Sequence, residues 1–298
     1  MRNYILLFIS MSFLINLNVH SSPRDATDHE QCDWSKQKES IDNIFSDIKE
    51  NIIGRSFKDL LSDSLQKSQI VVIGESHIEA LPKQIITNNI DLLYNNDFKY
   101  IAIEMINKTS QPELTQFCQG KITKDEFRTT WEDNWSYTDQ TDNYLNFIHE
   151  ACARGIKVIA VDERDNPDLL KQTDSEENNW RNRRMAQNII DIHNTDSGNI
   201  LFLTGSIHAF NISLNNASPV IKSFVGNSSA LLDIKKGLPN INITSINIKT
   251  SFPLTNTNER CADYNKLKKL KTLFPNKNYI LFQGSSLIPF DYIYIKLK

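Results

Sequence analysis

The chain has 298 residues, of which 40% are hydrophobic and 23% charged, and its formal net charge at pH 7 is −3. This composition is ordinary for a globular protein with a full hydrophobic core. The sequence pI near 6.1 and the lack of a basic stripe with interleaved aromatic residues argue against a nucleic-acid partner.

Residues 1–21 have the features of a secretory signal peptide. A short basic start at Met1-Arg2-Asn3 precedes an apolar run over residues 4–15, and Val19-His20-Ser21 supplies small residues for cleavage. The alternative is an N-terminal membrane anchor, but the apolar run is short for a bilayer span. We therefore expect a secreted or periplasmic protein with no stable membrane span after cleavage and, without a cysteine at the cleavage site, no lipid anchor.

Residues 22–35 are polar and without periodicity, and we interpret them as a flexible leader. Residues 36–298 contain no Pro/Gly-rich linker, which favours a single domain. Helical spacing of apolar residues predicts a first helix over 37–53, and Ser56 is a plausible cap for a second helix through Leu65.

Four apolar segments, each followed at once by polar residues, predict buried strands of one sheet. The first, Ile70-Val71-Val72-Ile73, runs into Gly74-Glu75-Ser76-His77. The other three segments are residues 100–103 followed by Glu104, residues 156–161 followed by Asp162-Glu163, and residues 200–204 followed by Gly205-Ser206-Ile207-His208. In an open parallel sheet the carboxyl ends of the strands lie along one edge, so these polar side chains are expected to converge there.

The segments between the strands predict an α/β fold, with a mainly parallel central sheet flanked by helices. A helix over 79–94 would make a βαβ unit, a helical insertion over 107–154 would follow the second strand, and a helix over 179–194 would follow a loop over 165–178. In the last third we expect strands over 241–248, 279–282 and 292–297 and a helix over 264–274, completing the same sheet.

Glu75 and His77 would point to the same side of an extended strand tip, where such a pair can bind a divalent cation or act as acid and base. Glu104 follows four apolar residues, where a carboxylate is costly unless it is paired, exposed or coordinating. His208 stands three residues after Gly205, the relation that His77 has to Gly74. This repeated Gly-x-x-His at strand ends is the strongest sign of a functional site.

Other residues leave alternatives open. Asp162 and Glu163 are either part of the site or salt-bridge partners of Arg183 or Arg184. The aromatic residues Trp131, Trp135 and Tyr137 either pack the insertion onto the core or wall a pocket above the strand ends. Cys32, Cys118, Cys152 and Cys261 permit two disulfides with three connectivities in an oxidising compartment, and their wide spacing argues against a zinc knuckle.

Together these motifs resemble the TIKI superfamily, and within it the ChaN-like, haem-binding-uptake branch. The segments that carry the resemblance lie roughly within residues 65–215: Gly74-Glu75-Ser76-His77, the Glu104 strand, Gln111-Pro112-Glu113-Leu114, the Trp131…Trp135 helix, Ala151-Cys152-Ala153-Arg154-Gly155, Arg184-Met185-Ala186 and Gly205-Ser206-Ile207-His208. The resemblance implies an α/β fold with acidic and histidine residues at one sheet edge, but no single reaction, since the superfamily includes metalloproteases, esterases and a haem binder.

The leading hypothesis is an exported hydrolase of a peptide or ester bond. Glu75, His77, Glu104 and His208 would be catalytic and would hold a divalent metal (Mn, Co or Zn) that activates water, with a small-molecule or peptide substrate. The alternative is a haem-binding protein of iron uptake, with Tyr137 or Tyr144 as the axial ligand. A secreted effector domain on the same fold is the third hypothesis.

Overall fold

The computed structural model describes residues 52–134, 140–164, 174–211, 227–249, 271–274, 278–283 and 290–296. The predicted signal peptide, the leader, Tyr137, Cys32 and Cys261 lie outside these residues, as does most of the helix predicted over 264–274. No helix in the described ranges is long and apolar enough to cross a bilayer.

The described strands form one sheet in the order β3-β2-β4-β1-β5-β7-β6. Every neighbouring pair is parallel except β6 and β7, which are antiparallel. The strands are β1 (Ile70–Glu75), β2 (Phe98–Asn107), β3 (Lys157–Asp162), β4 (Asn199–Gly205), β5 (Ile243–Lys249), β6 (Tyr279–Gln283) and β7 (Tyr292–Lys296). The predicted α/β class with a mainly parallel sheet is therefore confirmed, and the strands of the last third join the same sheet.

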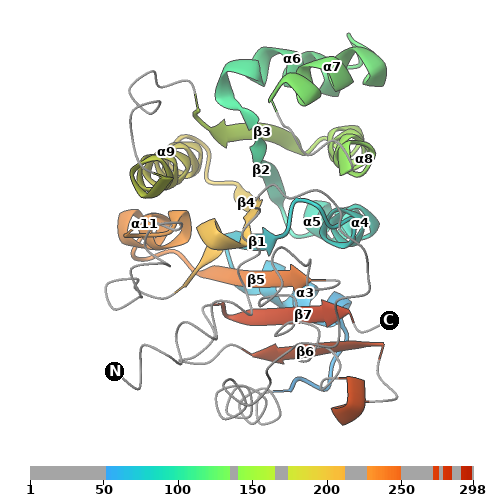
Figure 1. Ribbon diagram of the computed structural model, residues 1–298, viewed down its shortest axis with the longest axis vertical. Helices are drawn as coiled ribbons and strands as arrows, with labels where there is room; N and C mark the ends of the chain where they lie inside the picture. The colour runs from blue at the N-terminus through green and yellow to red at the C-terminus, as the bar shows by residue number, and fades with distance from the viewer. Residues whose placement is uncertain are drawn as a thin grey trace, which may run out of the picture.

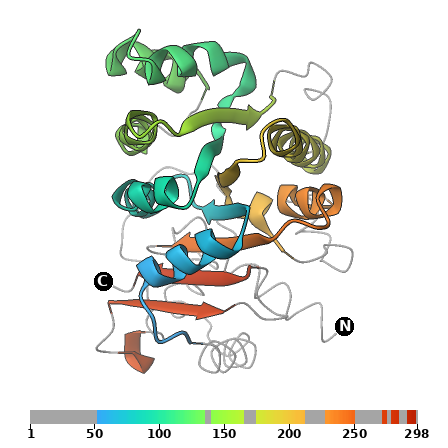
Figure 2. The same ribbon diagram turned by 180° about the vertical axis from the view of Figure 1, so that it is seen from behind.

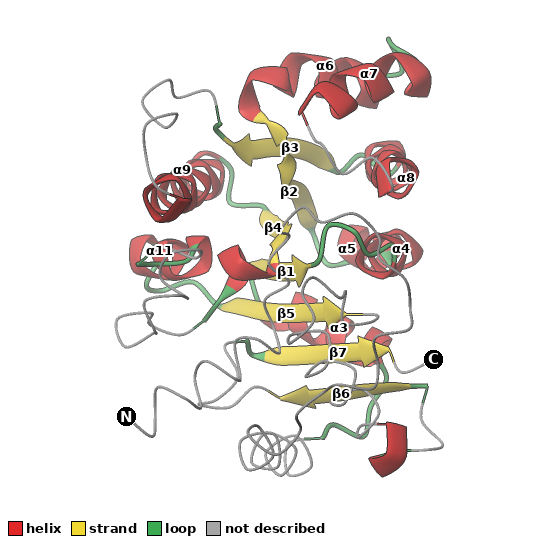
Figure 3. Cartoon of the chain, in the orientation of Figure 1, coloured by secondary structure: helices red, strands yellow, loops and turns green. Residues whose placement is uncertain are grey.

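Helices cover both faces of the sheet, as Figure 1 and the reverse view in Figure 2 show. The helices α9 (Asp174–Thr195) and α11 (Ala230–Gly237) lie on one side; α4 (Leu81–Asn88), α5 (Ile90–Asn95) and α8 (Thr141–Ala153) lie on the other. The remaining described helices are α3 (Phe57–Lys67), α6 (Gln111–Cys118), α7 (Lys124–Asn134) and the short 3₁₀ turns η2 (Lys108–Ser110) and η5 (Ser206–Ala209). Figure 3 shows α6 and α7 beyond β3, at one end of the sheet.

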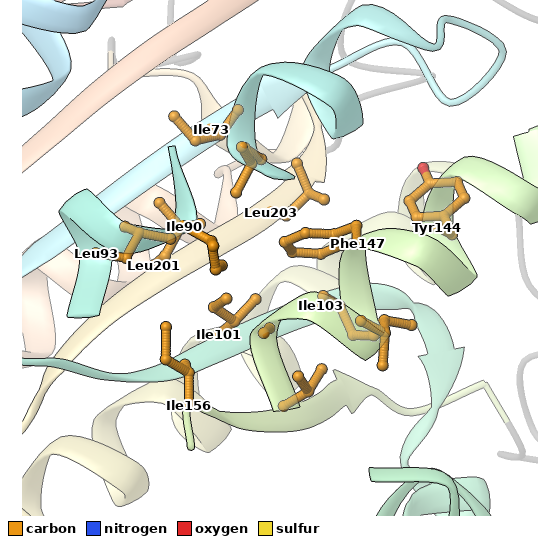
Figure 4. Packing of buried hydrophobic residues seen from close by; sticks show 14 of the residues in the cluster. Ile73, Ile90, Leu93, Ile101, Ile103, Tyr144, Phe147, Ile156, Leu201 and Leu203 are labelled. Atoms are coloured by element: carbon orange, nitrogen blue, oxygen red, sulfur yellow. The ribbon is translucent and has the colours of Figure 1, made fainter. Parts of the chain in front are cut away.

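Successive side chains of the central strands point to opposite faces of the sheet, so they pack into two different hydrophobic cores. Ile70 and Val72 of β1 belong to the core under α9 and α11, whereas Val71 and Ile73 belong to the core under α4, α5 and α8. Figure 4 shows this second core, with Ile73, Ile101 and Leu203 of three strands facing Phe147 and Tyr144 of α8. Burial on both faces explains why these strands are continuous apolar runs.

Within the described residues, the predicted helix after Ser56 and the helical insertion are confirmed, and two other helices are corrected. The helix predicted over 37–53 lies outside the described residues except at positions 52 and 53, which are not helical. Ser56 caps α3 as expected, in a reciprocal pair of hydrogen bonds with Asp59. The helix predicted over 79–94 is two helices, because the Asn89 side chain donates to the carbonyl of Ile85 and interrupts the helical hydrogen bonds. The helix predicted over 179–194 begins earlier, at Asp174, so the predicted loop over 165–178 ends sooner than expected.

The strand β3 lies at the edge of the described sheet, and its exposed backbone is paired by a side chain. The amide of Gln111 accepts from the backbone N–H of Ala160 at 2.7 Å and donates to the carbonyl of Val158 at 3.2 Å. The side-chain amide of Gln111 thus forms hydrogen bonds that a neighbouring strand would otherwise form. It leaves fewer free backbone groups at this edge for pairing with another chain.

Candidate functional site

The polar residues predicted at the strand ends converge. Nδ1 of His77 lies 3.1 Å from Oε1 of Glu75, and Nε2 of His208 lies 3.2 Å from Oε1 of Glu104. Nε2 of His77 lies 3.9 Å from the same Glu104 oxygen. Glu75, His77, Glu104 and His208 are therefore one contiguous group, called here the Glu–His cluster, although 133 positions of sequence separate its first and last members.

Glu75 is buried and each of its carboxylate oxygens has a strong partner. Oε2 lies 2.8 Å from the ammonium of Lys83, and Oε1 accepts from the hydroxyl of Tyr144 and from the His77 ring. Burial raises the pKa of Tyr144 well above its ordinary value, and the Glu75 charge adds to this effect. Tyr144 therefore remains a hydroxyl donor to Glu75.

Lys83 is fully buried and organises the tip of β1. Besides its ion pair with Glu75, its ammonium donates to the backbone carbonyls of Ser76, His77 and Glu79 at 3.3, 3.0 and 2.8 Å. It also lies 4.4 Å from the centre of the Tyr144 ring, a cation–π distance. Burial lowers the pKa of Lys83, and the Glu75 charge opposes that shift.

Glu104 is surrounded by donors. Its Oε2 accepts from the Thr204 hydroxyl at 2.6 Å and from the backbone N–H of Gly205 at 2.7 Å, and its Oε1 accepts from Arg181 at 2.8 Å. Burial alone would raise the pKa of Glu104, but His208, His77 and Arg181 outweigh it and hold this pKa well below its ordinary value of 4.5. Glu104 is thus a carboxylate held ionised by its neighbours.

Asp162 at the end of β3 is completely buried between two guanidinium groups. Arg181 contacts both of its oxygens and also reaches Glu104, so one arginine of α9 links the ends of β2 and β3. The second partner is Arg164, at 2.5 Å from Asp162. The predicted salt-bridge partners were therefore wrong for Asp162, whereas Glu163 does pair with Arg184, at 2.7 Å.

The ring of His208 is held on both sides. Its Nδ1 lies 2.5 Å from Oδ1 of Asn182, and the other end of that amide donates to the carbonyl of Ser228. The Asn182 oxygen is therefore the acceptor, which places a proton on Nδ1 of His208. Nε2 on the other side of the ring lies 3.2 Å from Oε1 of Glu104, so the imidazole bridges Asn182 and Glu104.

His77 is the member of the cluster that reaches the surface, with 13% of its side chain exposed. Its Nδ1 faces the Glu75 carboxylate, which is the acceptor in this contact, so Nδ1 carries the proton and Nε2 is the acceptor nitrogen. The Nε2 end of the ring rests against Gly205, where a Cβ atom would lie only 2.9 Å away. A side chain at position 205 would therefore displace the imidazole.

The arrangement does not fit the expected metal site. Within the described residues, no group of three or more His, Cys, Asp or Glu side chains is placed to hold a metal ion. The lone pairs of Glu75 and Glu104 already face ammonium, guanidinium, hydroxyl and amide donors, and a divalent cation would have to displace these cations. The chemistry of the cluster is that of a charged hydrogen-bond network.

In the alternative haem hypothesis, Tyr137 or Tyr144 is the axial ligand. Tyr144 has no exposed surface and its hydroxyl is bound to Glu75, so its geometry fits a hydrogen-bond donor within the cluster. Tyr137 lies outside the described residues and stays a prediction. Trp131 of the same insertion is fully buried and packs on Tyr144 at 4.7 Å between ring centres, which supports a packing role for this aromatic residue.

A disulfide joins Cys118 at the end of α6 to Cys152 in α8. Four cysteines allow three connectivities, and this bond is a member of one of them; Cys32 and Cys261 lie outside the described residues. The bond ties α6 to α8, which carries Tyr144, the donor to Glu75.

Residues 61–166 match the family model described as "Haem-binding uptake, Tiki superfamily, ChaN". A search of curated proteins found no match.

Among solved structures, the chain is similar to the type III effector HopBA1, with 12% identity, a TM-score of 0.53, and coverage of 83% of this chain and 96% of that one. ChaN of Campylobacter jejuni, described with cofacial haem binding, aligns at 15% identity and a TM-score of 0.49 over 81% of this chain and 92% of that one. The C-terminal region of Pasteurella multocida toxin aligns at 14% identity and a TM-score of 0.46 over 74% of this chain and 28% of that one.

Proposed function

From a TIKI/ChaN-like fold whose strand ends carry a Glu–His cluster, we propose that this protein is a hydrolase of a peptide or ester bond, with His77 as the general base. The observation that carries the proposal is the Glu75–His77 pair, in which a buried carboxylate orients an imidazole that is 13% exposed. A carboxylate that accepts from Nδ1 fixes the ring and its tautomer and leaves Nε2 as the nitrogen that can accept a proton, as a general base requires.

In the proposed reaction, Nε2 of His77 takes a proton from a water molecule as the water oxygen attacks the carbonyl carbon of the substrate. The bond from that carbon to the leaving nitrogen or oxygen then breaks, and the proton passes from His77 to the leaving group. Glu75 stabilises the imidazolium that forms in between. His208 and Arg181 hold Glu104 ionised, and its Oε1 lies 3.9 Å from Nε2 of His77, where positive charge develops in the transition state.

No step of this reaction passes through a metal, because the carboxylates that would bind one are already bound to Lys83 and Arg181. This differs from the metal-assisted reaction expected from the sequence. Elemental analysis of the purified chain beginning near Ser22, beside its His77→Ala variant, separates the two. One transition metal per chain that disappears in the variant would overturn the metal-free reaction.

The test of the hydrolase is a panel of fluorogenic peptides and p-nitrophenyl esters, assayed with and without a chelator. His77→Gln should lower the rate about 10²- to 10⁴-fold, the contribution typical of a general base. His149→Gln is the matched control, because His149 lies on α8 with 65% of its side chain exposed. A wild-type rate in His77→Gln would contradict the proposal.

Haem binding is the second candidate, and the observation that favours it is the family model matched by residues 61–166. Its test is titration with hemin, followed by the Soret band, in the wild type and in Tyr137→Phe and Tyr144→Phe variants. Saturation at a fixed ratio that is lost in Tyr137→Phe would favour haem uptake. The third hypothesis, an effector role, is supported only by the similarity of the fold to that of HopBA1. No residue of the Glu–His cluster supports it separately.

We also propose that the protein is exported. The apolar segment after Met1-Arg2-Asn3 supports this, as does the Cys118–Cys152 disulfide, a bond that persists in oxidising compartments. Fractionation of the source cells and N-terminal sequencing of the mature chain test it. A chain that retains Met1 and stays with the cytosol would contradict export.

A further inference from the structure

The proposed reaction builds negative charge on the carbonyl oxygen of the substrate, and Glu75 and His77 supply no donor to that oxygen. Removing such a donor typically slows an enzyme about 10²- to 10³-fold, so a site that works without a metal needs one near its base. Lys83 and His208 are buried, with 0% and 2% of their side chains exposed, and do not reach a substrate. The donor must therefore be another group beside the cluster, with surface that solvent reaches.

Arg181 of α9 has two N–H groups to spare. A guanidinium carries five N–H groups, and three of those of Arg181 are bound, the Nε–H to Asp162 and the two on Nη2 to Asp162 and Glu104. Among the described residues, Nη1 of Arg181 has no hydrogen-bond partner. It is not one of the unpartnered side-chain atoms that these residues shield from solvent, and 13% of the side chain is exposed. Nη1 is therefore a donor that a substrate oxygen can reach.

Arg181 and His77 approach the same atom. Oε1 of Glu104 lies 2.8 Å from Nη2 of Arg181 and 3.9 Å from Nε2 of His77. The guanidinium and the acceptor nitrogen of the imidazole are thus neighbours across one carboxylate oxygen, and each side chain is 13% exposed. A carbonyl group that accepts from Nη1 would therefore lie within reach of a water molecule bound to Nε2 of His77.

The guanidinium of Arg181 is held both charged and in place. Burial alone would lower the pKa of Arg181, but the charges of Asp162 and Glu104 raise it above its ordinary value. The same two carboxylates fix the plane of the guanidinium, so Nη1 needs no reorganisation in order to donate. Arg164, the other cation at this position, instead binds Asp162 and the backbone carbonyl of Glu104.

On this geometry, and resting on the hydrolase function proposed above, we propose that Arg181 is a catalytic residue whose Nη1 binds the carbonyl oxygen of the scissile bond. As the water oxygen bonds to the carbonyl carbon, the π electron pair of the carbonyl moves onto its oxygen, and Nη1 donates to the oxyanion that forms. The pair returns when the bond to the leaving group breaks, so Arg181 keeps its protons throughout. Arg181 thereby supplies the electrophile that a metal ion supplies in other hydrolases.

A binding experiment tests this donor without turnover. Dimethylphosphinate is a tetrahedral anion with two oxygens, and dimethyl sulfone has nearly the same shape without the charge. In an NMR titration, the wild type should bind the phosphinate at least about tenfold more tightly than the sulfone. Arg181→Lys keeps a cation between Asp162 and Glu104 but removes Nη1, so it should lose about that tenfold preference.

A kinetic ratio tests the same donor during the reaction. Sulfur is a weaker hydrogen-bond acceptor than oxygen, so a thiocarbonyl in place of the carbonyl of p-nitrophenyl acetate weakens the donation. The wild type should favour the oxygen ester at least about tenfold more than the uncatalysed reactions do. Arg181→Lys should lower kcat/KM about 10²- to 10³-fold and bring the ratio of the two esters close to the uncatalysed one. A merely structural arginine would slow both esters alike and leave their ratio unchanged.

Arg184→Lys is the matched control, because Arg184 lies on the same helix and pairs with Glu163 at 2.7 Å. It should keep both preferences, and thermal melting shows whether the two variants fold; if Arg181→Lys does not fold, the wild-type measurements decide. Equal binding of the two probes by the wild type, binding of neither, an unchanged preference in folded Arg181→Lys, or a wild-type ester ratio equal to the uncatalysed one would overturn the proposal. Phosphinate binding that depends on Arg181, in a protein that cleaves no substrate, would instead count against the proposed reaction alone.

Discussion

The ammonium of Lys83 lies 2.8 Å from Oε2 of Glu75, and neither side chain is exposed to solvent. The same ammonium donates to three backbone carbonyls at the tip of β1, including that of His77. One buried lysine thus neutralises the carboxylate that orients the proposed base and fixes the backbone that carries it. The stability of the fold and the geometry of the cluster therefore depend on the same pair.

Replacing Lys83 by Met should destabilise the protein strongly. Methionine keeps much of the volume but leaves the buried Glu75 charge without its cation, a change that typically costs about 3–5 kcal/mol. The free energy of unfolding, measured with urea, gives the effect. Lys67→Met is the control, because Lys67 is 72% exposed and its pair with Asp63 contributes about 0–1 kcal/mol at most.

The double variant Lys83→Met, Glu75→Gln sharpens this prediction. Removing both charges leaves no unpaired ion, so the double variant should lose less stability than the sum of the two single changes. Additive losses would show that Lys83 and Glu75 stabilise the fold independently, against the pairing inferred from their contact.

Glu104 should make stability depend on pH. The pKa of Glu104 in the folded protein lies well below 4.5, its ordinary value, because His208, His77 and Arg181 outweigh the effect of burial. The folded state therefore binds this proton less tightly than the unfolded state does. The contribution is fully present above pH 4.5 and is lost as the pH falls below that value toward the folded pKa.

Glu104→Gln should therefore have a flatter decline of the free energy of unfolding below pH 4.5 than the wild type has. Other carboxylates titrate in both proteins, so the difference between the two curves isolates position 104. Glu132→Gln, an exposed change of the same charge on α7, is the control. Parallel curves for wild type and Glu104→Gln would contradict the ionised state assigned to Glu104.

The Cys118–Cys152 disulfide should stabilise the helical insertion. It joins cysteines that are 34 positions apart, and closing a loop of that length in the unfolded chain is worth about 3–4 kcal/mol in the chain-entropy model. Cys118→Ser, Cys152→Ser should lower the free energy of unfolding by that amount while retaining Cys32 and Cys261. Equal stability of the double variant and the oxidised wild type would indicate that the bond is absent in the purified protein.

The sequence predicted which residues meet at the sheet edge, because a strand that ends in a polar residue places it there whatever the rest of the fold does. Glu75 and Asp162 are the last residues of β1 and β3, and the segment ending in His208 follows β4. Glu104 lies three residues before the end of β2, which is longer than the sequence predicted. Parallel pairing then brings the ends together, so local pattern and topology were sufficient for these positions.

The partners of these residues were missed because they lie on helices. Lys83, Tyr144, Arg181 and Asn182 approach the cluster only through the packing of α4, α8 and α9, which periodicity alone does not orient relative to the strand ends. A signal was present, since Arg181 and Asn182 stand four and three residues before the buried Met185, on the apolar face of α9. A polar residue on the apolar face of a helix is buried with that face, and it therefore needs a buried hydrogen-bond or ion-pair partner.

Gly205→Ala should damage the proposed chemistry more than the fold. The backbone of Gly205 has φ −58° and ψ 144°, which alanine adopts without strain. A Cβ atom there would lie 2.9 Å from Nε2 of His77, and the ring cannot retreat easily because Glu75 and Tyr144 hold its other nitrogen. A misplaced base of this kind costs about 10²-fold in rate.

The measurement pairs kcat/KM on a substrate that the wild type cleaves with the melting temperature of each variant. Gly54→Ala is the control, because no atom lies within 4 Å of the Cβ position there and both quantities should stay near the wild type. For Gly205→Ala we expect a large fall in kcat/KM with a small change in melting temperature, because the methyl group moves one ring rather than the core. A wild-type rate in Gly205→Ala would place the reacting base away from Nε2 of His77 and so contradict the orientation inferred from the Glu75 contact.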